Sequence, residues 1–135
     1  MGTHALIKVY DENIDLLTTI YHHYDGYLSG VGKKIAEFTL GRMIVHGFND
    51  TNKPIANGMG NLAAQLIYHL VQVSGMVGNV YIDVPSSGEE EYIYEVYFSG
   101  TDKEVKLACT VDNELRFLGS PAEVLEWIAS MEDKQ

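Results

Sequence analysis

The residues best suited to chemistry gather in one short segment, Tyr21-His22-His23-Tyr24-Asp25-Gly26-Tyr27. Successive side chains of a strand point to opposite faces, so His22 and His23 cannot bind one metal ion together without a bulge. His23 and Asp25 can share a face, and a histidine beside a carboxylate is the pair used in general base catalysis. No nucleophile accompanies this pair, so a small hydrolase using His23 and Asp25 is an alternative interpretation. A polar and aromatic turn is the favoured one, with no catalytic residue, metal ion or other cofactor.

Two glycine-rich segments, residues 25–32 and 57–61, indicate a second kind of chemistry, the binding of a small anion. Each leads into a run with helical spacing, and the N–H groups at a helix start attract negative charge. Glycine lets these groups face outward, and Gly30→Val or Gly60→Val is expected to abolish binding while leaving the fold mostly intact. The sequence thus predicts a site for a nucleotide-like anion where the two segments meet. Its candidate residues are Asp25, Gly26, Tyr27, Ser29, Gly30, Gly32, Lys33, Asn57, Gly58, Gly60 and Asn61, with Lys34, Arg42 and Lys53 nearby in the sequence.

The first half of the chain must position these segments. β-branched and aromatic residues predict strands over residues 5–10 and 16–21, and turn residues between them predict a hairpin. Ser29 is expected to cap a short helix, and residues 41–61 are expected to be irregular. The spacing of Leu62, Leu66 and Leu70 predicts the main core helix over residues 61–72, capped by Asn57 or Asn61.

The second half alternates apolar and polar residues, which predicts an antiparallel meander over 79–84, 91–98 and 104–111 with a short fourth strand. Four tyrosines, at positions 81, 92, 94 and 97, are expected on two adjacent strands of it. Ser120-Pro121-Ala122-Glu123 is a capping box that starts a helix over 121–131. The whole chain, residues 1–135, is expected to be a single α+β domain with a frayed tail at 131–135. Its mostly antiparallel twisted sheet should carry two to three helices on one face.

Charge and composition limit the partners. The chain holds 19 acidic and 9 basic residues, a net charge of −10. Such a surface repels phosphate backbones, so duplex nucleic acid is not an expected partner, although mimicry of nucleic acid toward a basic protein is an alternative. No apolar run reaches the roughly 20 residues of a membrane span. The single Cys109 cannot form an intramolecular disulfide and is expected in the core.

Three motifs occur together: Met1-Gly2-Thr3-His4-Ala5-Leu6-Ile7, His23-Tyr24-Asp25-Gly26-Tyr27-Leu28-Ser29-Gly30-Val31-Gly32 and Ile35-Ala36-Glu37-Phe38. In this combination the chain resembles a group of small uncharacterised proteins of bacteriophages, prophages and some bacteria. The pattern of that group is M-G-T-x-x-L, then H/Q-Y/W-D-G-Y-P-S-G-x-G, then L-x-x-F; Leu28 stands in the place of its proline. The resemblance implies a phage or mobile-element setting and no particular activity.

These observations favour a non-enzymatic accessory protein that acts through protein interaction and self-association. The expected partners are a second copy of the chain and a host protein, in the cytoplasm of the host if the protein is phage-encoded. A module that sequesters a small anionic ligand at the glycine-rich helix starts is the first alternative, and the hydrolase is the second.

Overall fold

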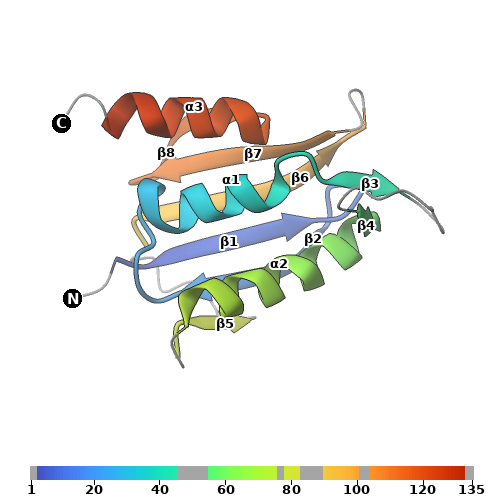
Figure 1. The fold of residues 1–135 in the computed structure, drawn as a ribbon, viewed down its shortest axis with the longest axis horizontal. Helices are drawn as coiled ribbons and strands as arrows, with labels where there is room; N and C mark the ends of the chain where they lie inside the picture. Colours follow the sequence, from blue (N-terminus) through green and yellow to red (C-terminus); the bar gives the residue numbers. More distant parts are fainter. Residues whose placement is uncertain (1–2, 46–54, 76–77, 83–89, 101–103, 133–135) are drawn as a thin grey trace.

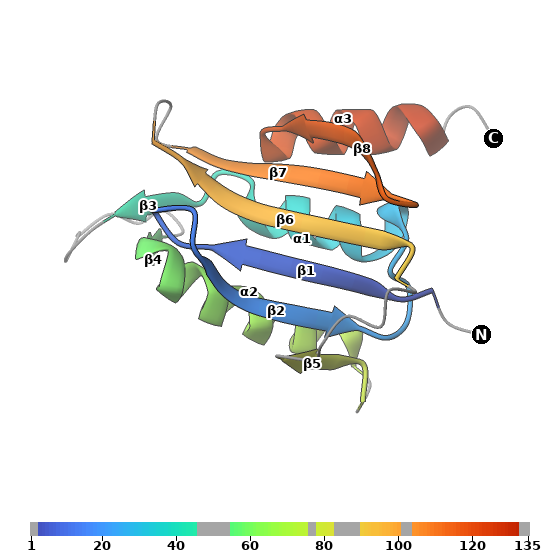
Figure 2. The same cartoon turned by 180° about the vertical axis from the view of Figure 1, so that it is seen from behind.

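A six-stranded sheet carries three helices on one face (Figures 1 and 2). The structure, a computed structural model, describes residues 3–45, 55–75, 78–82, 90–100 and 104–132. In sheet order the strands are β5 (Val80–Ile82), β2 (Leu16–His22), β1 (Ala5–Tyr10), β6 (Tyr92–Ser99), β7 (Glu104–Val111) and β8 (Glu114–Gly119). The helices are α1 (Lys33–Thr39), α2 (Gly58–Ser74) and α3 (Pro121–Glu132). Within the described ranges no helix covers the opposite face, which we call the open face (Figure 2).

The expected α+β architecture is confirmed, but the order of the strands is not a simple meander. β1 and β6 pair in parallel at the centre of the sheet, and the other neighbouring pairs are antiparallel. β5 pairs with β2 and not with β6, because α2 runs back along the sheet and delivers the chain beside the end of β2. The meander prediction is therefore wrong for residues 80–82, and residues 83–84 lie outside the described residues.

The tyrosines of the second half are separated as a result. Tyr81 lies on β5, with β2 and β1 between it and β6. Tyr94 is buried in the core on the helix side, and Tyr92 packs against that core. Tyr97 points to the open face, because side chains alternate along β6. The expectation of four tyrosines on two adjacent strands is wrong.

The predicted hairpin of β1 and β2 is confirmed, with Ile7 opposite Ile20. The Asp11 carboxylate accepts hydrogen bonds from the Asn13 and Asp15 amides, at 2.8 and 2.9 Å, and so holds the turn. Residues 41–61 are not wholly irregular: β3 (Met43–Val45) and β4 (Ile55–Asn57) form a small parallel pair.

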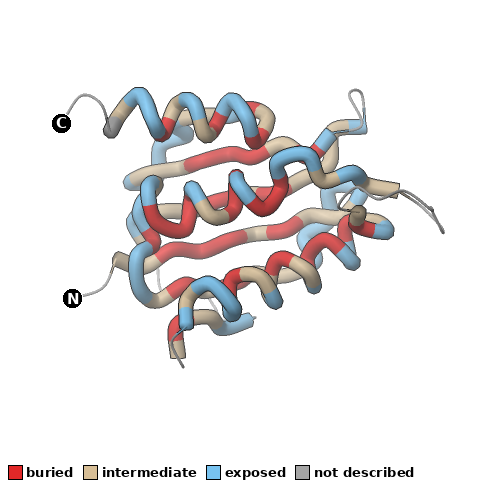
Figure 3. The backbone as a smooth tube through the Cα atoms, viewed as in Figure 1, coloured by how far each residue is buried: buried red, intermediate tan, exposed pale blue. Residues whose placement is uncertain are grey.

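α2 is the main core helix, as predicted, and it is longer than the predicted 61–72. Leu62, Leu66 and Leu70 are fully buried, and so are Ile7 and Ile20 of the sheet beneath them. Figure 3 shows buried residues along the central strands and on the helices that lie over them. Repeated apolar residues on one helical face thus build the core between the helices and the sheet.

α1 follows a π-type turn, η1 (Leu28–Gly32). Ser29 lies inside this turn, and no side-chain hydrogen bond caps α1, so the prediction of a Ser29 cap is wrong. A Cβ atom at Gly30 would lie 2.3 Å from the Asp25 carbonyl oxygen. The turn therefore needs glycine at this position, where the chain folds back on itself.

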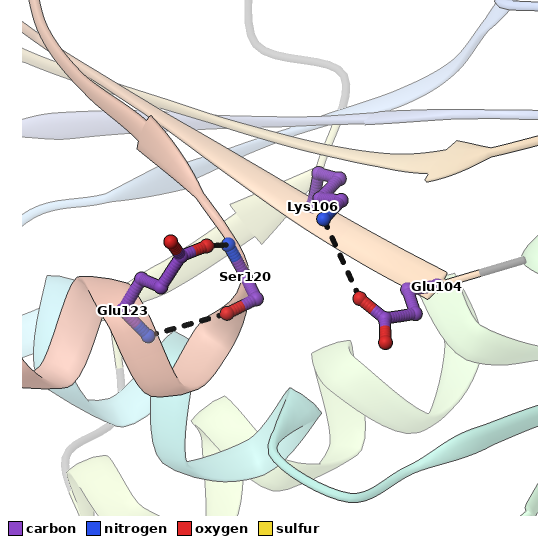
Figure 4. A network of polar contacts seen from close by, with 4 residues as sticks. All are labelled: Glu104, Lys106, Ser120 and Glu123. Atoms are coloured by element: carbon purple, nitrogen blue, oxygen red, sulfur yellow. Dashed lines mark hydrogen bonds and ion pairs between the residues drawn. The ribbon is translucent and has the colours of Figure 1, made fainter. Parts of the chain in front are cut away.

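The capping box of α3 is confirmed (Figure 4). The Ser120 amide donates to Glu123 Oε1 at 2.9 Å, and the Glu123 amide donates to Ser120 Oγ at 3.3 Å. These hydrogen bonds lower the pKa of Glu123. The helix extends to Glu132, so the frayed tail does not begin at residue 131; residues 133–135 lie outside the described residues.

Candidate anion-binding groove

The two glycine-rich segments do not meet. The Gly26 amide donates to the Thr3 carbonyl at 2.8 Å, just before β1 begins. The Met59 amide donates to Glu12 Oε2 at 2.9 Å, just after β1 ends. β1 has 6 residues and is therefore about 20 Å long. Residues 25–32 and 57–61 lie at its opposite ends, so one small ligand cannot contact both segments.

From Gly30 to Gly32 the backbone N–H groups bond within the loop. The Gly30 amide donates to the Tyr27 carbonyl and the Val31 amide to the Asp25 carbonyl, each at 2.9 Å. The Asp25 side chain accepts a hydrogen bond from the Tyr27 hydroxyl at 3.3 Å, and the remaining candidates here, Ser29 and Lys33, are exposed. The close approach at Gly30 means that Gly30→Val would distort the loop, contrary to the expectation of a largely intact fold. Ligand binding by this loop alone stays a prediction.

At residues 57–61 the start of α2 is already bound by an acidic side chain of the same protein. The Glu12 carboxylate accepts a hydrogen bond from the Met59 amide. Asn57 is the N-cap residue without a side-chain cap bond; its own amide donates to Asn61 Oδ1 at 2.8 Å. Gly58 has a left-handed φ of 81°, and a Cβ atom at Gly60 would meet open space. The chain thus supplies the negative charge that this helix start attracts.

The structure gives no support to the alternative interpretation of His23 and Asp25 as a catalytic pair. His23 Nδ1 lies 2.9 Å from the Tyr21 hydroxyl oxygen, and no hydrogen bond joins His23 to Asp25 among the described contacts. The same hydroxyl lies 2.8 Å from His4 Nδ1. Sequence reasoning missed His4, because its approach to His23 depends on the register of β1 against β2.

A hollow of about 690 Å³ lies between α1 and α2, on the outer side of the helical layer. A second hollow of about 430 Å³ shares four of its lining residues, so the two form one channel, which we call the α1–α2 groove. The groove is lined by Lys34, Phe38 and Arg42 from α1 and the segment after it, and by Gln65, His69 and Val73 from α2, among others.

Arg42 is the central charge of the groove. Its Nε donates to the Phe38 carbonyl at 3.0 Å and Nη1 donates to Gln65 Oε1 at 2.9 Å. The guanidinium carbon lies 4.0 Å from the centre of the Phe38 ring, a cation–π contact. Within the described part of the chain no acidic residue forms an ion pair with Arg42. Burial lowers the pKa of Arg42, but an arginine stays charged in proteins.

Two further basic side chains, those of His69 and Lys34, line the groove. The His69 ring lies 5.0 Å from the Phe38 ring, between centres. Burial lowers the pKa of His69, and the charges of Arg42 and Lys34 lower it further, although Glu37 opposes them. Three basic side chains thus face one acidic side chain, Glu37, in a chain of net charge −10. The sequence prediction had Lys34 and Arg42 near the site but missed Phe38, Gln65 and His69.

Comparison of the chain with protein-family models, with curated proteins and with solved structures found no match. Among the described residues, no helix has the length and apolar character needed to cross a membrane.

Proposed function

We propose that this protein is a non-enzymatic binding module that holds a small organic anion in the α1–α2 groove. The observation that carries the proposal is Arg42, which is half-buried, held in place by Phe38 and Gln65, and without an acidic partner in the described chain. A partly desolvated charge without a counterion costs free energy, and a bound anion would recover it. A groove of about 690 Å³ is within the usual range for small-molecule sites, about 300–1,000 Å³.

The lining indicates the chemistry of the ligand. Tyr68 and Val73 offer exposed apolar surface, while Lys34, Arg42 and His69 offer positive charge or hydrogen-bond donors. A nucleotide has the matching parts, an aromatic base and a phosphate. This proposal keeps the nucleotide-like ligand of the sequence analysis and moves its site from the glycine-rich segments to the groove.

Isothermal titration calorimetry with nucleoside monophosphates tests the proposal, with the uncharged nucleosides as ligand controls. Arg42→Gln should weaken binding by about tenfold or more, because a charge-assisted hydrogen bond is lost. The matched control is Arg116→Gln on β8, where the arginine is exposed and pairs with Glu114 at 3.3 Å. Absence of binding by the whole panel, or equal affinity in Arg42→Gln, contradicts the proposal.

Self-association is the second proposed function, and it rests on the exposed edge of the sheet. β8 is an edge strand of the described sheet, and its Leu115 and Leu118 are 60% and 53% exposed. Exposed apolar residues on an edge strand favour pairing with another chain. Leu118→Lys should reduce a dimer to monomer in light scattering, and a monomer in the unmodified protein at high concentration contradicts the proposal.

A phage setting, the host cytoplasm and a host-protein partner also remain proposals, supported by the sequence resemblance alone.

A further inference from the structure

His4 and His23 are neighbours on the open face of the sheet. Ala5 pairs with His22 across β1 and β2, and Leu6 pairs with Tyr21, so the same register places His4 opposite His23. Ala5 and His22 are fully buried on the helix side, so alternation turns His4 and His23 to the open face. Their ring centres lie 4.6 Å apart.

The Tyr21 hydroxyl lies between the two imidazoles. Its oxygen is 2.8 Å from His4 Nδ1 and 2.9 Å from His23 Nδ1, so three possible metal ligands converge from one face. All three residues are half-buried, which leaves access from solvent for an ion and its water molecules.

We propose that His4, His23 and Tyr21 bind a divalent transition-metal ion of the Zn²⁺ or Cu²⁺ type. Imidazole nitrogen is a preferred ligand of both ions. With metal–nitrogen distances of about 2.0–2.1 Å, tetrahedral ligands lie about 3.3 Å apart. The Tyr21 oxygen and each Nδ1 atom therefore need to move apart by about half an ångström, a shift that side-chain rotation can supply.

The set of available ligands determines the expected strength of binding. No group of three or more His, Cys, Asp or Glu side chains suited to a metal ion occurs among the described residues. The site thus offers two imidazoles and one phenol oxygen, with water for the remaining positions, and we expect an exchangeable ion rather than a permanent structural one.

Calorimetry with ZnCl₂ or CuCl₂ added to the whole chain tests the site, with MgCl₂ as the hard-ion control. Zn²⁺ and Cu²⁺ should bind and Mg²⁺ should not, since Mg²⁺ prefers oxygen ligands. His4→Ala and His23→Ala should each weaken binding by about tenfold or more, and Tyr21→Phe should weaken it less. His69→Ala, which removes a half-buried histidine from the helix side, is the matched control and should leave the affinity unchanged.

A measurement on the unmodified protein avoids any effect of the variants on folding. The electron paramagnetic resonance spectrum of the Cu²⁺-loaded protein should show two nitrogen ligands, and His69→Ala should give the same spectrum. The proposal is overturned if neither ion binds, if His4→Ala and His23→Ala keep full affinity, or if the spectrum shows no nitrogen ligands. Tyr21→Phe with full affinity would remove Tyr21 from the proposed ligands.

Discussion

His22 should make the stability of this protein depend on pH. The side chain lies at the end of β2 in the core and has no solvent exposure. Neither ring nitrogen has a hydrogen-bond partner among the described residues. Burial is the largest influence and lowers the pKa of His22; the charge of Lys34 lowers it further, whereas the Tyr24 backbone and the charge of Asp25 oppose the shift without reversing it. The folded protein therefore holds a neutral imidazole where the unfolded chain can hold a charged one.

The sign and the upper limit of the effect follow from this difference. An unfolded histidine has a pKa of about 6.5. As pH falls below that value, the unfolded chain binds a proton that the folded chain does not, so the free energy of unfolding decreases. His22 imposes no such penalty well above pH 6.5. One proton changes the free energy of unfolding by at most about 1.4 kcal/mol per pH unit, and the integrated loss between pH 7.5 and 5.5 is at most about 1.4 kcal/mol.

Urea unfolding at these two pH values measures the effect. His22→Leu removes the titrating group and both unsatisfied nitrogens at similar volume, so it should lose about 1 kcal/mol less than the unmodified protein on acidification. Carboxylates titrate in both proteins, so the difference between the two losses isolates His22. His23→Asn, one residue along the strand and on the other face, retains His22 and should keep its contribution. Equal losses in the unmodified protein and in His22→Leu would refute the reasoning.

Three further features give direct tests. Leu66→Ala should lower the free energy of unfolding by about 2–5 kcal/mol, because Leu66 is fully buried, and Ser120→Ala by only about 1 kcal/mol, through the lost cap. Urea midpoints compare the two, and a larger loss in the Ser120 variant contradicts the core role of α2. Burial raises the pKa of the Cys109 thiol to about 12, so a thiol reagent should label it only after unfolding; rapid labelling of the folded protein contradicts this. Tyr94→Phe should cost about 1–3 kcal/mol in urea unfolding, because its buried hydroxyl donates to the Gly26 carbonyl at 2.7 Å, and an unchanged midpoint contradicts it.

The elements that the sequence predicted well are those whose causes lie close together in the chain. The spacing of Leu62, Leu66 and Leu70 defines the buried side of α2 without reference to any other segment. The cap of α3 needs only Ser120 and Glu123, three positions apart. Pairing of distant strands has no such local cause. The three residues of β5 suit any sheet edge, and their place beside β2 follows only from the direction in which α2 runs.

The candidate site shows the same limit at the level of hydrogen bonds. Glycine-rich helix starts indicate N–H groups that need an acceptor, but they do not identify that acceptor. The Val31 N–H group donates to the Asp25 carbonyl in the same loop. The Met59 N–H group donates to the Glu12 carboxylate, which is 47 positions away in the sequence. These hydrogen bonds occupy N–H groups that the sequence analysis had predicted to bind a ligand. Arg42 differs from them, because its hydrogen-bond partners among the described residues are a carbonyl and a side-chain amide, and neither of these neutralises its positive charge. An anion would compensate that charge, and for this reason the groove, rather than either glycine-rich segment, is the place where a ligand should be sought.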